Sequence, residues 1–171
     1  MKRPSMSTTR RPVVLLVQQS RDDGLEMYAE FLRYYGVAVI PVSHARDALE
    51  LAPQADIVVT GMNLDDPMDG VELASRLRKD DCTKFMPIIV LTACAYPKDR
   101  ERAEGAGCDV FLPKPCLPDD LLGEVRQLLV ATRPRTADTP QVFQLPSHVT
   151  ARHAHGWHGA HQLSRALARS S

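Results

Sequence analysis

Five short apolar runs alternate with segments of helical spacing between residue 13 and about residue 130, and this alternation constrains the fold more than any other feature. The runs are rich in Val and Ile and bounded by polar residues or glycine: VVLLV (13–17), VAVIPV (37–42), DIVVT (56–60), MPIIVL (86–91) and DVFL (109–112). Such runs are typical of strands that are buried on both faces, as the strands of a parallel sheet are.

Segments with helical spacing separate these runs. In LEMYAEFLRYYG one face carries Leu25, Tyr28, Leu32 and Tyr35, and Gly36 follows as a helix stop. Four further segments have the same character: DALELA (47–52), GVELASRLRKD (70–80), PKDRERAEGAG (97–107) and PDDLLGEVRQLLV (118–130). Five strand and helix units predict an α/β fold, a doubly wound parallel sheet with helices on both faces.

The two ends of the chain differ from this middle part. We expect a basic disordered arm over residues 1–12, a globular domain over 13–131, and a Pro-rich linker with a flexible tail containing His and Arg over 132–171. The apolar runs are far shorter than the about 18 residues of a membrane span. The basic amino terminus is not followed by the apolar segment of a secretory signal.

Charge and cysteine usage narrow the classes of partner and compartment. Residues 13–130 hold 20 acidic and 12 basic residues, a net charge of −8, whereas each flanking segment is basic. An acidic body argues against nucleic acid as the main partner. The four cysteines form no CxxC pair, which predicts reduced thiols in the cytoplasm; they are Cys82, Cys94, Cys108 and Cys116.

The residues that follow the predicted strands are the candidate site. In open parallel sheets, ligands bind beyond the carboxyl ends of the strands, where the strand order reverses. The residues at those ends are Gln18 and Gln19 after the first strand, Gly61 after the third, Thr92 after the fourth and Lys114 after the fifth. They do not form a complete nucleophile and base arrangement, so we do not expect an enzyme.

Several motifs in one order resemble the receiver domain of bacterial two-component response regulators. They are VVLLV, MYAEFLRYYG, DIVVTGMNLDDPMDGVELASRLR, PIIVLTA and RAEGAGCDVFLPKP, spread over residues 13 to about 130. The resemblance implies a flavodoxin-like fold with strand order 2-1-3-4-5. It also implies that Thr92 and Phe111 are the switch pair and that Lys114 is the site lysine, joined to Pro115 by a cis peptide bond.

The same resemblance shows what this chain lacks. It implies a phosphoacceptor aspartate at the position of Gly61, and an acidic pair that helps to hold Mg²⁺ at Gln18 and Gln19. Glycine has no side-chain atom on which an acyl phosphate could form. A carboxamide offers Mg²⁺ an oxygen dipole without the charge. We therefore expect a degenerate phosphorylation site whose Mg²⁺ binding is lost or weak.

Nearby acids leave an alternative open. Asp65 and Asp66 lie in the loop after the third predicted strand, and a displaced carboxylate there could still accept a phosphoryl group. Asp22 lies near the first turn of the first predicted helix. Without its customary partners, Lys114 is expected to pair with Asp65 or Asp66, to reach water, or to capture a small anion with the loop amides.

Two weaker signals suggest other kinds of sensing. Cys94 and Cys116 each lie two residues beyond a site position, and a lowered thiol pKa near Lys114 would favour a redox pair. The tail carries His148, His153, His155, His158 and His161, a spacing that can bind Zn²⁺ or Ni²⁺ weakly. A redox-responsive or metal-responsive sensor is therefore a further alternative.

The interpretation that we favour is a single-domain signalling protein of a two-component phosphorelay. It would act as an atypical receiver that binds a partner protein without aspartate phosphorylation. The resemblance implies a histidine kinase or another signalling protein as partner, docking on residues 97–130, with a homodimer also open. Packing of Phe111 as an ordinary buried aromatic is favoured over a switching role, because the phosphoryl trigger is missing. The sequence does not identify the pathway.

Overall fold

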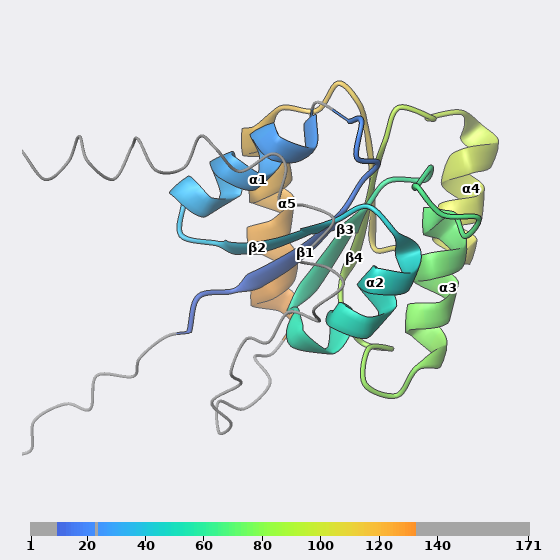
Figure 1. Ribbon diagram of the computed structural model, residues 1–171, viewed down its shortest axis with the longest axis horizontal. Coiled ribbons are helices and arrows are strands. Elements are labelled where there is room, and N and C mark those ends of the chain that lie inside the picture. Colours follow the sequence, from blue (N-terminus) through green and yellow to red (C-terminus); the bar gives the residue numbers. More distant parts are fainter. Residues whose placement is uncertain (1–9, 23, 133–171) are drawn as a thin grey trace, which may run out of the picture. The chain divides into compact units, whose positions relative to one another are not determined.

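Five parallel strands form a single sheet in the computed structural model, which describes residues 10–22 and 24–132 (Figure 1). They are β1 (Val13–Val17), β2 (Ala38–Val42), β3 (Ile57–Thr60), β4 (Ile88–Thr92) and β5 (Val110–Pro113). Their order across the sheet is β2-β1-β3-β4-β5, and every neighbouring pair is parallel. The predicted flavodoxin-like topology is confirmed.

Helices cover both faces of this sheet. They are α1 (Gly24–Tyr34), α2 (Ala45–Leu51) with the short 3₁₀ helix η1 (Ala52–Gln54), α3 (Gly70–Lys79), α4 (Pro97–Gly105) and α5 (Pro118–Ala131). α1 packs beside α5 on one face, and α2, α3 and α4 lie in sequence on the other (Figure 1). All five predicted helices are present, which confirms the doubly wound architecture.

The alternation of side chains along each strand divides the core into two layers. Ile57 and Val59 of β3 pack toward α1 and α5, where they join Leu32, Leu121 and other buried residues. On the other face, Val90 of β4 packs with Met62, Ala103 and Phe111. Because both faces of β1, β3 and β4 are covered, every residue of these three strands is buried.

At the edge of the sheet where the strands begin, two aspartates tie neighbouring strands together. Asp56, just before β3, accepts a hydrogen bond from the amide of Val13 at 2.8 Å. Asp109, just before β5, accepts one from the amide of Ile88 at 2.8 Å and pairs with Arg78 of α3 at 2.9 Å. These carboxylates bind the first amide of the adjacent strand, so they hold the strand starts in register.

Arg78 makes several of the hydrogen bonds at the edge where the strands begin. Besides Asp109, its guanidinium donates to three backbone carbonyls: Met86 at 2.6 Å, Gly107 at 2.9 Å and Lys84 at 3.3 Å. The aliphatic part of its side chain lies against Gly107, whose φ of 92° suits glycine. Arg78 thus links the segment before β4, which contains Lys84 and Met86, to the segment before β5, which contains Gly107 and Asp109.

Some details differ from the predictions or lie outside them. Gly36 stops α1 as predicted, with φ of 84°, but Tyr35 lies beyond the helix and is 45% exposed, so its place on the buried face was wrong. Residues 1–9 of the predicted arm (1–12), residues 133–171 of the predicted linker and tail (132–171), and Asp23 lie outside the described residues. In the part of the chain that is described, no helix is long and apolar enough to cross a membrane.

Candidate functional site

Gly61 follows β3 at the carboxyl edge of the sheet, the edge where the strands end. Its amide donates to the carbonyl of Val17 at 2.8 Å, which continues the pairing of β3 with β1. α3 begins directly above it, because a Cβ on Gly70 would lie 1.8 Å from the carbonyl oxygen of Gly61. The φ of Gly61 is not positive, so backbone conformation does not require glycine there.

The side chain of Gln18 fills the space next to Gly61. Gln18 is 2% exposed, and its Nε2 donates to the carbonyl of Leu91 at 3.2 Å. Its Oε1 accepts a hydrogen bond from Nζ of Lys114 at 3.1 Å. A Cβ on Gly61 would approach this Oε1 to 2.9 Å, closer than real Cβ contacts. The amide therefore bridges β4 and Lys114 across the position where the sequence lacks an acid, while the neighbouring Gln19 is exposed.

Lys114 forms an ion pair with Asp22, at the start of α1. The side chains are 17% and 24% exposed, so both charges are largely withdrawn from water. The other oxygen of Asp22 accepts from the amide of Gly24 at 2.9 Å, which holds the carboxylate in place. The Lys114–Pro115 peptide bond is cis, as the resemblance implied.

The partners predicted for Lys114 were wrong, because Asp65 and Asp66 are engaged elsewhere. Asp65 accepts from the amide of Ser20 at 2.8 Å, and hydrogen bonding by Ser20 lowers the pKa of this carboxyl. Asp66 accepts from the amide of Met68 at 3.0 Å within its own loop. The loop acids thus stabilise loops, and the acid nearest to the lysine in space comes from the β1–α1 connection.

The two switch positions are both buried. Thr92 is 4% exposed and its Oγ1 accepts from the amide of Cys94 at 3.1 Å. Phe111 is 7% exposed and packs against Met62 and Val90, with the guanidinium of Arg100 5.3 Å from its ring centre. In this structure the aromatic ring is a packed core residue under α4.

The cysteines do not form the predicted redox pair. Cys94 packs against the cluster on the α4 side of the sheet, whereas Cys116 packs against the cluster under α1 and α5. Burial raises the pKa of Cys116, and the carboxylates of Asp120 and Glu124 raise it further, while Lys114 lowers it less. The expectation of a lowered pKa at Cys116 was therefore wrong. None of the four cysteines forms a disulfide bond.

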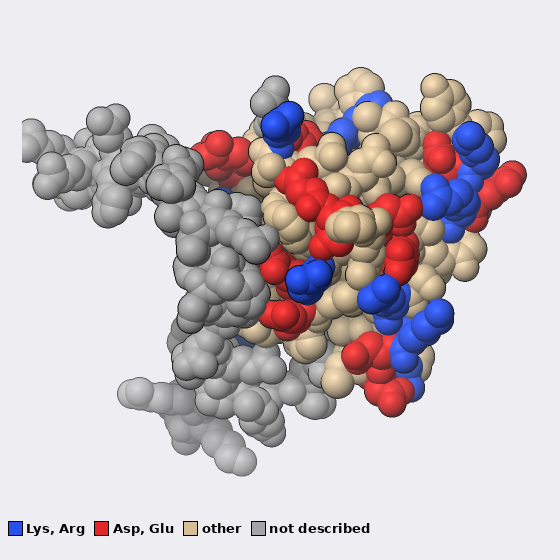
Figure 2. Space-filling view, turned by 45° about the vertical axis from the view of Figure 1, so that its right-hand side comes forward, with Lys and Arg blue, Asp and Glu red and all other residues tan. Residues whose placement is uncertain are grey.

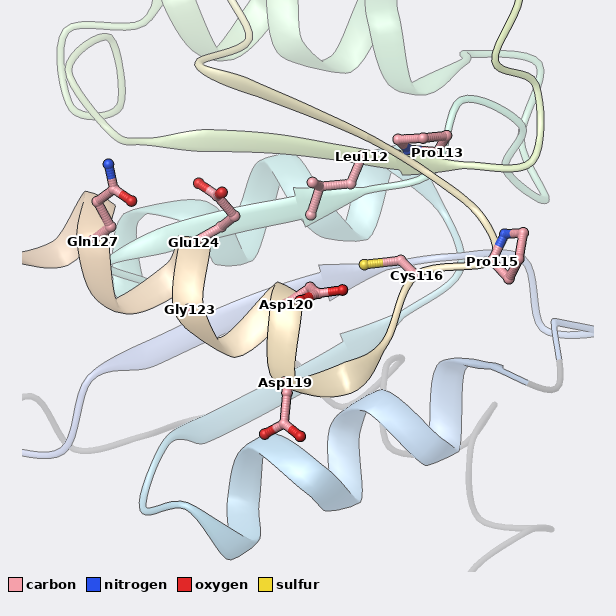
Figure 3. A pocket seen from close by; sticks show the side chains of 9 residues that line it. All are labelled: Leu112, Pro113, Pro115, Cys116, Asp119, Asp120, Gly123, Glu124 and Gln127. Carbon is pink, nitrogen blue, oxygen red and sulfur yellow. The ribbon is translucent and has the colours of Figure 1, made fainter.

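Sequence reasoning missed a groove between β5 and α5, with a volume of about 590 Å³ (Figure 3). Its lining includes Leu112 and Pro113 of β5 and Gly123 of α5, together with the acids Asp120 and Glu124. A glycine within a predicted amphipathic helix was the one signal that could have indicated it. On the face shown in Figure 2, acidic and basic side chains are interspersed.

No group of three or more His, Cys, Asp or Glu side chains among residues 10–22 and 24–132 is arranged to hold a metal ion. The candidate site therefore consists of a neutral amide, a lysine and one carboxylate. These three groups satisfy one another through hydrogen bonds and an ion pair.

Several curated proteins with a similar sequence are named response regulators. Polar-differentiation response regulator DivK of Brucella anthropi is 24% identical over 106 residues, which cover 61% of this chain and 85% of DivK. Response regulator MprA of Mycolicibacterium vanbaalenii is 34% identical over 127 residues. That match covers 72% of this chain but only 53% of MprA, so the chain spans about half the length of that relative.

Solved structures agree in fold. A putative response regulator from Chloroflexus aurantiacus has a TM-score of 0.64 at 29% identity, over 70% of this chain and 99% of that one. The receiver domain of sensor histidine kinase PA1611 from Pseudomonas aeruginosa, which has a magnesium ion coordinated in its active site cleft, has a TM-score of 0.64 at 25% identity, over 71% and 99%. The family model described as response regulator receiver domain matches residues 14–126. This chain belongs to the response regulator receiver domain family.

Proposed function

We propose that this receiver works by binding a partner protein and that no aspartate in it is phosphorylated. The observation that carries the proposal is the position of the Gln18 amide. Its Oε1 lies 2.9 Å from where a side chain on Gly61 would begin, and it accepts a hydrogen bond from Lys114. An amide oxygen in that position does not form an acyl phosphate, so the space for the phosphoacceptor is filled by a chemically inert group.

The site residues also do not fit the Mg²⁺ that the fold family uses. The PA1611 receiver has a magnesium ion coordinated in its active site cleft. Here the ammonium of Lys114 lies between the amide of Gln18 and the carboxylate of Asp22. Mg²⁺ favours charged oxygen ligands, and an adjacent ammonium repels it. Magnesium would have to displace Lys114 from its only ion pair in the described residues.

Without phosphorylation, the receiver is expected to signal by binding a partner protein. We place the partner, a histidine kinase or another signalling protein, on the surface of residues 97–130, and we place the protein in the cytoplasm. Exposed side chains suited to contact lie in or beside this region: Leu117 within it is 68% exposed, and Tyr96, one residue before it, is 69% exposed.

The test of the proposal is chemical. The full chain is incubated with Mg²⁺ and acetyl phosphate, and intact mass is measured beside a receiver that carries an aspartate at the equivalent position. We expect no gain of a phosphoryl group in this chain while the second receiver gains one, because Gly61 and Gln18 have no acceptor oxygen of the required kind.

A displaced carboxylate is the alternative that the same experiment detects. If a phosphoryl adduct appears in the native chain and disappears in Asp65→Asn or in Asp66→Asn, the protein is a phosphorylatable regulator and the proposal is wrong. Asp65 already accepts a hydrogen bond from Ser20 and Asp66 one from Met68. One oxygen of each carboxylate is therefore already engaged.

A further inference from the structure

We propose that the groove between β5 and α5 binds a cationic, arginine-rich or lysine-rich segment of a partner protein. This inference rests on the proposed function, since it names the chemistry of the partner and the place where it docks. It is carried by three features of the groove: a sheet edge that no other described strand covers, a lining that contains acids and no Lys or Arg, and room left by a glycine.

The groove lies at an edge of the sheet. β5 pairs with β4 alone, so its other side is not covered by a strand among the described residues. Leu112 and Pro113 form the β5 wall of the groove, and α5 forms the opposite wall (Figure 3). Apolar walls of this kind suit the aliphatic stems of long cationic side chains.

Two carboxylates on α5 give this groove its charge. Asp120 and Glu124 lie four residues apart, so they share one face of the helix, and in Figure 3 both are directed from α5 toward the groove. Like charges at this spacing repel each other. Neither acid has an ion pair among residues 10–22 and 24–132. Other acids, such as Glu26 and Glu30, also form no ion pair among these residues. What distinguishes the groove is its lining, which contains Asp119, Asp120 and Glu124 and no Lys or Arg.

The thiol of Cys116, which also lines the groove, lies close enough to these carboxylates to be affected by their charge. After burial, the charges of Asp120 and Glu124 are among the contributions that raise the pKa of Cys116. The negative charge of these carboxylates disfavours a thiolate and favours a bound cation. A bound cation would also reduce the repulsion between the two carboxylates.

Gly123 leaves the groove open between these acids. A Cβ on Gly123 would meet nothing within 4 Å. Glycine weakens a helix interior relative to residues with a side chain, so its presence there is not explained by helix stability or by crowding. A side chain at this position would occupy the groove.

The experiment is a binding titration with the full chain. A labelled hexa-arginine peptide is the probe, with hexa-glutamine as neutral peptide, and fluorescence anisotropy is measured at low and high salt. We expect binding of hexa-arginine alone, weakened by salt. In the double variant Asp120→Asn/Glu124→Gln, we expect affinity to fall about tenfold or more.

Matched variants separate the groove from the general acidity of the domain. Glu26→Gln/Glu30→Gln removes two exposed acids at the same spacing on α1, and its affinity is expected to stay within about twofold of the native chain. Gly123→Gln is expected to weaken binding without lowering the thermal midpoint. Gly105→Gln, which adds the same side chain to α4 where a Cβ also meets nothing within 4 Å, is expected to bind like the native chain.

Equal binding by all these variants, or no binding of hexa-arginine, would overturn the inference. The outcome is independent of the phosphodonor experiment. A chain that gains a phosphoryl group yet binds the peptide through Asp120 and Glu124 would contradict the proposed function alone. A chain that gains none and ignores the peptide would contradict the groove alone.

Discussion

At the scale of single residues, the ammonium of Lys114 is held by two acceptors, Oε1 of Gln18 at 3.1 Å and the carboxylate of Asp22. The amide group of Gln18 uses its other end to bind the carbonyl of Leu91. One cation is thus balanced by one anion, with a neutral group that links them to β4. The charges at this largely buried site therefore neutralise each other.

Asp22→Asn tests this balance. Asparagine keeps an acceptor for Gly24 but removes the charge opposite Lys114, so we expect the free energy of unfolding to fall by about 1–2 kcal/mol in urea denaturation. Asp66→Asn is the matched control, because Asp66 forms a hydrogen bond but no ion pair, and it is expected to stay within about 0.5 kcal/mol of the native chain.

A double-mutant cycle with Lys114→Met completes this test. If Asp22 and Lys114 interact directly, the loss in the double variant is smaller than the sum of the two single losses by about 1 kcal/mol. Additive losses would mean that the ion pair does not contribute to stability.

The site positions could be predicted from the sequence, whereas their contacts could not. Strand ends follow from the apolar runs, so Gln18, Gly61 and Lys114 were placed correctly at one edge. The partner of Lys114 is 92 residues away in the chain. Asp22, Asp65 and Asp66 all lie in loops at that edge, and only the path of each loop decides which carboxylate reaches the lysine.

At the scale of elements, α3 illustrates how one helix serves both edges of the sheet. Its first residue packs on Gly61, and Asp69 caps it by accepting from the amide of Glu72 at 2.7 Å, as expected for an aspartate before a helix. Near its other end, Arg78 reaches the backbone of the segments around β4 and β5. The helix therefore fixes the distance between the candidate site and the opposite edge.

Arg78→Lys is expected to destabilise the domain more than a surface change of the same kind. Lysine cannot reproduce the planar fork that binds three carbonyls and Asp109, so we expect a loss of about 2–3 kcal/mol in urea denaturation. Arg76→Lys, on the same helix, affects one exposed pair with Glu72 and is expected to change stability by less than about 0.5 kcal/mol. Equal effects would contradict the structural role of Arg78.

The helices and strands were predictable because their periods differ so clearly, yet the role of Arg78 was not. In the sequence Arg76, Arg78 and Lys79 form one basic end of a helix, which is typical of a solvated surface. The carbonyls that select Arg78 come from segments whose positions depend on the whole sheet. Tyr35 was misplaced for a different reason: the prediction continued the helical spacing past Tyr34, the residue at which α1 ends.

At the scale of the whole molecule, the two core layers are built from residues between Val14 and Leu129. The parallel sheet followed from the sequence pattern, whereas the strand order followed from the family resemblance. Within the core, α5 contributes Leu121, Leu122 and Val125, which are all buried against the α1 side. The domain boundary predicted at residue 131 stays a prediction that a truncated chain can test.

A fragment of residues 10–132 is expected to unfold cooperatively, with a free energy of unfolding within about 0.5 kcal/mol of that of the full chain. It retains both core layers and the pair of Arg10 with Asp56. A fragment of residues 10–117, which lacks α5, is the control and is not expected to fold, because it exposes one side of the sheet. Circular dichroism in urea measures both, and a loss of folding in the longer fragment would contradict the boundary.

Because Gln18 lies so close to Gly61, the order in which these two positions are substituted affects how well each substitution is tolerated. A substitution at position 61 alone introduces a Cβ 2.9 Å from the amide oxygen of Gln18. The end of that side chain must then shift, which disturbs its hydrogen bonds to Leu91 and Lys114. A change at position 18 first removes this obstacle, so a carboxylate at position 61 is tolerated better afterwards than before. The effects of substitutions at these two positions are therefore expected to depend on each other, with a preferred order of change.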